Sequence, residues 1–103
     1  MNSLILPEWP APPGVRALTT TRRGGTSVAP WHGFNLGDHV GDDPQAVAAN
    51  RSLLRRELPA EPVWLRQVHG TRCVDAATVA PGVEADASFT RQRGVVCAIL
   101  TAD

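Results

Sequence analysis

The amino-acid sequence predicts an α+β fold with few helices that forms an incomplete part of a larger single-domain fold. Three features lead to this class: several short stretches typical of strands, one amphipathic helix, and a final apolar strand. That last strand does not alternate with polar residues, so both of its faces should be buried. One helix does not supply the layers needed to cover it. We therefore expect the remaining covering elements to lie outside these 103 residues.

The first half of the chain is predicted to contain two short strands and a long surface loop. Residues 4–6 are aliphatic and residues 15–21 are rich in β-branched residues, which favours strands. The intervening PEWPAPPG is an irregular connection, since proline fixes the backbone and lacks an N–H donor. A turn, RRGGTS, and the loop VAPWHGFNLGDHVGDD follow. Long ordered loops are uncommon and often functional.

One amphipathic helix is predicted after this loop. Asp43 is a good N-cap, Pro44 suits the first helical position, and Pro59 closes the run. The apolar side consists of Ala46, Val47, Leu53, Leu54 and Leu58. Asn50 interrupts this stripe, and buried polar groups are normally paired. We expect either a core amide that bonds a neighbouring loop, or a residue that holds the functional loop in shape.

The second half of the chain is predicted to consist mainly of strands. Residues 63–69 alternate as a half-buried strand that ends at His69. Residues 71–74 either pair back on it or continue it. After a polar stretch comes VVCAILTAD, the apolar strand predicted to be buried on both faces.

Composition limits the classes of partner. The net charge is zero, with ten basic and ten acidic residues, which argues against a general electrostatic grip on nucleic acid. No apolar run reaches the roughly 20 residues needed to cross a bilayer, and the first ten residues lack the basic start of a secretion signal. We therefore expect a cytoplasmic protein with no nucleic-acid or membrane partner. Cys73 and Cys97 should stay reduced there.

Five soft side chains are candidate metal ligands, but their spacing alone predicts no site. They are His32, His39, His69, Cys73 and Cys97. None of them forms a CxxC pair or an HExxH helix, and a catalytic zinc needs about three protein ligands. From spacing alone, a structural histidine explains His69 better than a metal ligand does.

Several loop residues could bind an anionic or nucleoside substrate. In TTRRGGTS, Arg22 and Arg23 stand beside two glycines, so the backbone could approach an anion that the guanidinium groups clamp. A plain turn with solvated arginines explains these residues equally well. In FNLGDHVGDD, Asn35 lies among acidic residues, a composition that turns also favour. Asp86 in EADAS and Asp103 in TAD are carboxylates beside small residues.

Taken together, these segments resemble one known family. The motifs TTRRGGTS, FNLGDHVGDDP, VWLRQVHG, ADA and TAD occur in the order and at the separations of the laccase-domain proteins, also called the polyphenol oxidase or multifunctional purine nucleoside phosphorylase family. Family members are well over twice this length. The resemblance therefore implies that residues 1–103 are the N-terminal part of the domain, that its remainder is absent from this chain, and that the fold is a layered, mixed β-sheet.

The resemblance also implies a zinc site to which this chain supplies one ligand. His69 matches the histidine of the family's QVHG motif, which makes it the metal ligand and the catalytic residue. The other two ligands are a cysteine directly after TAD and a later histidine in a motif like HAGWRG, both beyond Asp103. By this alignment Cys97 is not the ligand cysteine, and Cys73 has no matching role.

The activity that the resemblance implies is phosphorolysis of purine nucleosides, including methylthioadenosine, together with deamination of adenosine. Arg22 or Arg23 would contact phosphate, and Asn35 would contact the nucleoside. Two alternatives stay open. One is a copper-dependent polyphenol oxidase, although three histidines supply few copper ligands. The other is a non-catalytic module, because a chain with one ligand of three should show no turnover alone.

Overall fold

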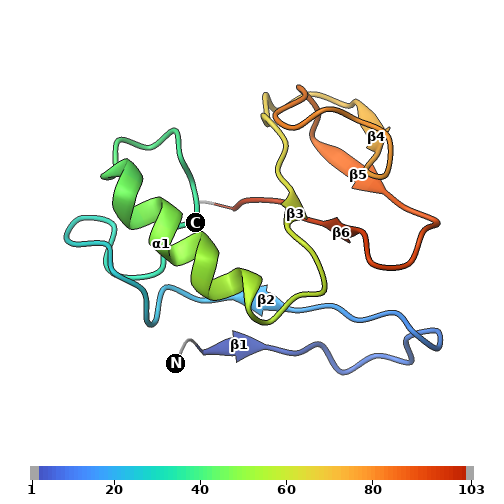
Figure 1. Cartoon of the computed structure of the whole chain (residues 1–103), viewed down its shortest axis with the longest axis horizontal. Coiled ribbons are helices and arrows are strands. Elements are labelled where there is room, and N and C mark those ends of the chain that lie inside the picture. Colours follow the sequence, from blue (N-terminus) through green and yellow to red (C-terminus); the bar gives the residue numbers. More distant parts are fainter. Residues whose placement is uncertain (1–2, 102–103) are drawn as a thin grey trace. The chain divides into compact units, whose positions relative to one another are not determined.

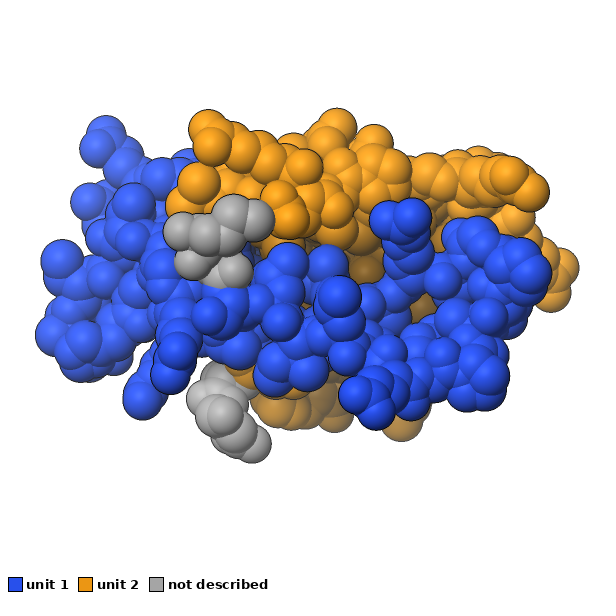
Figure 2. All heavy atoms as spheres, turned by 90° about the horizontal axis from the view of Figure 1, so that it is seen from below, with its two compact units in different colours: residues 1–51 blue, residues 52–103 orange. Residues whose placement is uncertain are grey.

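The computed structural model describes residues 3–101, which belong to two compact units, residues 1–51 and residues 52–103 (Figure 2). We treat each unit separately. Within the described residues there are one helix and six short strands, and the strands form three two-stranded sheets (Figure 1). These small sheets and the single helix confirm the predicted α+β class with few helices.

In the first unit, β1 (Leu4–Ile5) pairs antiparallel with β2 (Thr19–Thr20). Thr21 Oγ1 extends the pairing by donating a 2.7 Å hydrogen bond to the Ser3 carbonyl. The second strand is shorter than predicted, and residues 15–18 lie outside it. The reason is that the two-residue β1 offers them no ladder partner for their backbone groups.

The loop after β2 contains no helix or strand over residues 21–43, as predicted. Ser27 and Gly33 form an isolated bridge in which each N–H donates to the other's carbonyl at 2.9 Å. The prediction of a surface loop is only partly right, because Phe34 and Leu36 are buried. The hydrophobic effect favours removing these two side chains from water, and their burial anchors the loop.

The predicted helix is α1 (Pro44–Arg55), and its N-terminus is capped as expected. Asp43 Oδ1 accepts a hydrogen bond from the Gln45 backbone N–H at 2.9 Å, as an N-cap side chain does. The helix ends before Leu58, whose N–H instead bonds the carbonyl three residues earlier at 3.2 Å. Pro59 disfavours helical backbone at the residue before it, which accounts for the early end.

The second unit contains two parallel strand pairs. β3 (Pro62–Val63) pairs with β6 (Val96–Cys97), and β4 (Cys73–Asp75) pairs with β5 (Ala87–Phe89), as Figure 1 shows. The core of this unit is a small apolar cluster against which two half-buried valines pack. It consists of Leu65, Val74 and Ala85.

The predicted strand over residues 63–69 is wrong beyond Val63. Arg66 forms only an isolated bridge with Glu84, and the chain then leaves the ladder. His69 has a φ of 58°, a left-handed backbone that no strand accommodates. The backbone N–H groups of this segment bond a carboxylate instead of a neighbouring strand.

The final strand is shorter than predicted, and part of it is exposed within this chain. β6 has two residues and, within residues 3–101, pairs only with β3. Cys97 is exposed, and Ile99 keeps 50% of its surface accessible. Within residues 3–101 no layer covers these two side chains, and the prediction that elements outside these residues cover the strand stays a prediction.

Candidate functional site

His69 lies on an exposed turn between the Arg66 bridge and β4. A φ of 58° is uncommon for any residue other than glycine, so the local backbone must be held in place by other contacts. The turn ends the strand-like stretch and leaves His69 accessible to solvent. The geometry therefore presents an imidazole outside the core rather than packing it inside.

The carboxylate of Asp86 holds this turn. Its Oδ1 accepts hydrogen bonds from the backbone N–H groups of Val68 at 3.0 Å and His69 at 2.8 Å, and its Oδ2 accepts one from Gly70 at 2.7 Å. These donors favour the charged carboxylate, the Gly70 N–H most of all, and they lower the pKa of Asp86 below its ordinary value. Three bonds to one side chain fix the backbone on both sides of His69.

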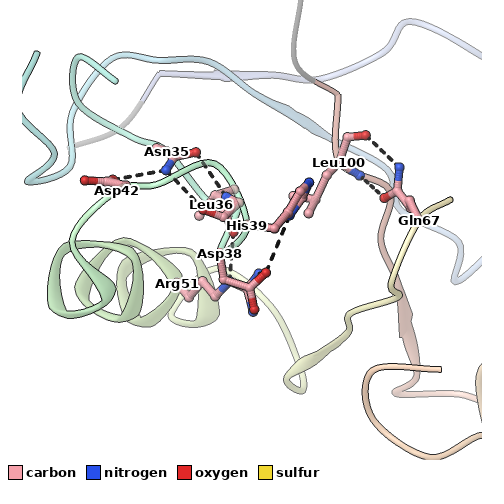
Figure 3. A network of polar contacts seen from close by, with 9 residues as sticks. Asn35, Leu36, Asp38, His39, Asp42, Arg51, Gln67 and Leu100 are labelled. Atoms are coloured by element: carbon pink, nitrogen blue, oxygen red, sulfur yellow. Dashed lines mark hydrogen bonds and ion pairs between the residues drawn. The ribbon is translucent and has the colours of Figure 1, made fainter. Parts of the chain in front are cut away.

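Gln67 connects the same segment to the chain beyond β6. Its Nε2 donates to the Leu100 carbonyl at 3.0 Å, and its Oε1 accepts from the Leu100 N–H at 2.7 Å (Figure 3). A side-chain amide thus replaces the backbone partner that a strand neighbour would give. The segment before His69 is thereby tied to residues that directly precede TAD.

His69 fits the role of one ligand in a metal site. Neutral imidazole is a common ligand of both zinc and copper, and an accessible ring on a fixed backbone suits that task. Within residues 3–101 there is no group of three or more His, Cys, Asp or Glu side chains that could hold a metal ion. Cys73 and Cys97 are exposed free thiols. Asp103, the other carboxylate singled out from the sequence, lies outside the described residues.

Arg22 and Arg23 lie on an exposed turn of the first unit. Within the described part of the chain, neither guanidinium is paired with a carboxylate. Gly25 follows with a φ of 76°, and a Cβ there would lie 2.5 Å from the Gly33 carbonyl oxygen. Only glycine fits this close approach, so the turn lies tightly against the loop while both arginines stay exposed.

Asn50 holds the loop from the middle of α1. It is 0% exposed, and its Nδ2 lies 2.8 Å from the Asn35 carbonyl, 2.9 Å from Ser27 Oγ and 3.1 Å from the Gly33 carbonyl. Its Oδ1 accepts a 2.8 Å hydrogen bond from the Thr26 N–H. The predicted core amide that bonds a neighbouring loop is confirmed. Because the partners are mainly loop backbone, the same bonds hold that loop in shape.

The Asn35 side chain is used inside its own loop (Figure 3). Its Nδ2 donates to the Gly37 carbonyl at 3.1 Å and to Asp42 Oδ2 at 3.0 Å, and its Oδ1 accepts from the Gly37 N–H at 3.1 Å. Ser27 Oγ also donates to Asp42 Oδ2, at 2.5 Å. The hydrogen bonds from Ser27 first and Asn35 second lower the pKa of Asp42.

The neighbouring charged residues form a looser group. Arg51 Nε donates to the Leu36 carbonyl at 2.9 Å, and its Nη2 lies 3.9 Å from Asp38 Oδ1 (Figure 3). His39 Nδ1 lies 3.6 Å from the same oxygen. Asp38 and His39 are both exposed, so these two contacts are weak.

The structure thus gathers the predicted residues in two places. Asn35 and the arginine turn belong to one hydrogen-bonded loop in the first unit, while His69 belongs to a turn of the second. The sequence singled out Asp86 as a carboxylate but not as the residue that binds the His69 turn, and it gave Gln67 no role. Their only signals were small residues around Asp86 and the place of Gln67 in QVHG.

Comparison with known proteins places the chain in a family. The family model described as multi-copper polyphenol oxidoreductase laccase matches residues 16–103. The chain belongs to this laccase family. A relative from Pseudomonas aeruginosa named purine nucleoside phosphorylase is 50% identical over 100% of this chain and 42% of its own length. The purine nucleoside phosphorylase YfiH of Escherichia coli K12 is 48% identical over 100% of this chain and 44% of its own length.

A solved structure has the same fold over nearly the whole of this chain. The crystal structure of a Neisseria meningitidis protein matches 97% of this chain and 42% of that protein, with a TM-score of 0.88 and 43% identity. The chain therefore spans less than half the length of these relatives and corresponds to their N-terminal part. In the part of the chain that the structure describes, no helix is both long and apolar enough to cross a membrane.

Proposed function

We propose that the complete protein, to which residues 1–103 contribute the N-terminal part of one domain, is a zinc-dependent purine nucleoside phosphorylase. It also cleaves methylthioadenosine with phosphate and deaminates adenosine. The observation that carries the proposal is the accessible His69, held by Asp86 on a left-handed turn within the QVHG motif. The names of the relatives support the class of reaction.

In this proposal His69 is one zinc ligand and the other ligands follow Asp103. Zinc held there would supply Lewis-acid activation of water, the chemistry that deamination of a purine ring requires. Imidazole binds a metal in its neutral form. The three backbone hydrogen bonds to Asp86 fix the position of the His69 Cα, from which the ring extends. The exposed apolar residues of the β6 segment support the further expectation that the rest of the domain covers them.

Phosphorolysis requires a held phosphate. In that reaction a phosphate oxygen bonds the ribose anomeric carbon as the bond to the purine nitrogen breaks, and the base leaves with a proton. Arg22 or Arg23 supplies guanidinium donors to the phosphate, since neither is paired with a carboxylate within residues 3–101. Asn35 contributes its remaining Oδ1 lone pair as an acceptor for a hydroxyl or amino group of the nucleoside.

The alternative function is copper-dependent oxidation of phenols, which the description of the matching family model favours. Imidazole suits copper as well as zinc, so His69 fits either metal. Multicopper oxidation, however, needs a histidine-rich ligand set, and this chain supplies three histidines. His32 and His39 belong to the loop of the first unit, whereas the QVHG motif belongs to the second.

We also propose that the protein works in the cytoplasm without a nucleic-acid or membrane partner. The exposed free thiols of Cys73 and Cys97 support a reducing compartment. The zero net charge supports the absence of general affinity for nucleic acid.

The deciding experiment assays the full-length protein, loaded separately with zinc and with copper, against inosine plus phosphate and against a catechol. We expect phosphate-dependent release of hypoxanthine and ribose 1-phosphate with zinc. Arg22→Ala and Arg23→Ala should each be compared with Arg91→Ala, an exposed arginine of the second unit. At least one of the first two should raise the KM for phosphate about tenfold or more. Catechol oxidation with copper and no phosphorolysis with zinc would contradict the proposal.

A further inference from the structure

Three consecutive backbone N–H groups converge on Asp86. The donors are Val68, His69 and Gly70, at 3.0, 2.8 and 2.7 Å. Between 16 and 18 residues separate each donor from the acceptor, so this is a tertiary contact rather than a local turn. Gly70 sits close to the carboxylate, because a Cβ built on it would lie 3.3 Å from Asp86 Oδ2.

Asp86 itself is firmly anchored. The preceding Ala85 is 0% exposed and belongs to the core cluster of the second unit. The Asp86 N–H donates to the Arg72 carbonyl at 3.1 Å, and the next residue begins β5, which pairs with β4. The carboxylate is therefore a fixed point of the sheet from which a neighbouring turn can be positioned.

The His69 ring has no such support of its own. Metal-binding histidines usually donate their second ring N–H to a carboxylate or carbonyl that orients the imidazole. Within residues 3–101 no side chain or backbone group forms a hydrogen bond with the His69 ring. The direction of its Cα–Cβ bond is then set by the backbone, whose φ of 58° is disfavoured unless other contacts hold it.

We propose that Asp86 is a positioning residue for the metal site: by binding the three N–H groups of residues 68–70, it holds the left-handed turn that presents His69 to a divalent cation. This inference rests on the proposed function, since it requires that His69 is a ligand. Asp86 acts through the backbone and does not touch the metal.

The test is the metal site of the full-length protein carrying Asp86→Asn. The amide oxygen can still accept from the Val68 and His69 N–H groups, but the N–H₂ group faces the Gly70 N–H and cannot accept its hydrogen bond. The turn is then held less firmly. We expect zinc affinity, measured by competition with a chelator, to fall about tenfold or more. The visible absorption spectrum of the cobalt(II)-substituted protein should also change, because the position of one ligand changes.

Asp75→Asn is the matched control. Asp75 is also a half-buried carboxylate of the second unit, and its Oδ1 caps a turn by accepting the Ala77 N–H at 2.9 Å. It should leave zinc affinity and the cobalt spectrum unchanged. If Asp86→Asn does not fold, Asp86→Glu, which keeps the charge but moves the carboxylate by one methylene, takes its place with the same expectation.

The outcomes separate the two proposals. If His69→Ala abolishes zinc binding while the Asp86 variant binds zinc like the wild type with an unchanged cobalt spectrum, the positioning role is refuted and the proposed function stands. If His69→Ala itself leaves zinc affinity unchanged, both proposals fall. Loss of affinity in the Asp86 variant but not in Asp75→Asn supports the positioning role.

Discussion

Asn50 shows how one side chain can organise a loop. It lies in α1 between the buried Val47 and Leu54, and its amide bonds backbone groups of residues 26–35. A buried amide without partners would be costly, so the loop and the helix are linked through its hydrogen bonds. This is why a polar residue is tolerated in the middle of an apolar helix face.

Replacing Asn50 should therefore destabilise the protein strongly. Asn50→Ala leaves the Thr26 N–H and the Asn35 carbonyl without their Asn50 partner, and the Gly33 carbonyl keeps only the Ser27 N–H. We expect the free energy of unfolding of the full-length protein to fall by at least about 2 kcal/mol in urea titrations. Gln45→Ala, an exposed change on the same helix, should cost under about 0.5 kcal/mol. Equal effects of the two substitutions would contradict this role for Asn50.

Asp42 should make stability depend on pH in the acid range. Its folded pKa lies below 3.8 because the charged form accepts hydrogen bonds from Ser27 and Asn35. A depressed pKa stabilises the fold at pH values above the unfolded pKa, and this contribution is lost as the pH falls through the folded pKa. Asp42→Asn should therefore destabilise the full-length protein at pH 7 and progressively less below about pH 4. Urea titrations across this range, with the exposed Glu8→Gln as control, would show a pH-independent penalty if this account is wrong.

At the residue scale, the sequence predicts features that depend on neighbouring residues, but it does not predict hydrogen bonds between segments far apart in the chain. The Asp43 cap and the paired amide of Asn50 follow from helix chemistry and from the cost of burying polar groups. The bonds from residues 68–70 to Asp86 join segments 16 to 18 residues apart. They depend on a left-handed histidine that residue preferences do not predict.

The strands depend on partners distant in the sequence, which explains why they are shorter than predicted. β3 and β6 pair in parallel at Pro62↔Val96 and Val63↔Cys97. Strand propensity marked residues 63–69 and the final apolar stretch, but pairing decides how far each ladder runs. Beyond Val63 the side chain of Gln67, rather than a ladder, reaches Leu100.

Gln67 should consequently contribute to stability, because it links the chain after β3 to the chain after β6. Gln67→Ala removes two hydrogen bonds to the Leu100 backbone, at 2.7 and 3.0 Å. We expect the free energy of unfolding of the full-length protein to fall by about 1–2 kcal/mol and the Leu100 amide to exchange faster with deuterium. Gln92→Ala, at an exposed position of the same unit, should change neither quantity. An unchanged exchange rate at Leu100 in the Gln67 variant would argue against the link.

At the scale of the whole molecule, the sequence of this chain does not predict which surfaces of its elements are buried. The apolar final stretch suggested burial on both faces, yet Ile99 is 50% exposed. The chain spans 42% of the length of its Pseudomonas aeruginosa relative. The apolar residues of the final strand therefore fit a larger fold better than they fit the contacts within residues 3–101. The apolar pattern of a strand reflects all the elements that pack on it, including those outside these residues.

Because the chain spans less than half the length of its relatives, we can predict how it behaves by itself. Under the proposal that His69 is one of three zinc ligands, residues 1–103 alone should bind zinc weakly and catalyse no inosine phosphorolysis. Hypoxanthine release by the purified 103-residue chain, followed at substrate concentrations that saturate the full-length protein, checks this. Measurable turnover would mean that the complete ligand set lies within these residues.

The most direct test of the account is the zinc content of the full-length protein with and without the His69 imidazole. We predict about one zinc ion per chain in the wild type and in His39→Ala, an exposed histidine of the first unit. His69→Ala should bind almost none while keeping its fold by circular dichroism. A folded His69→Ala protein with a full complement of zinc would contradict the central claim that this turn exists to present a metal ligand.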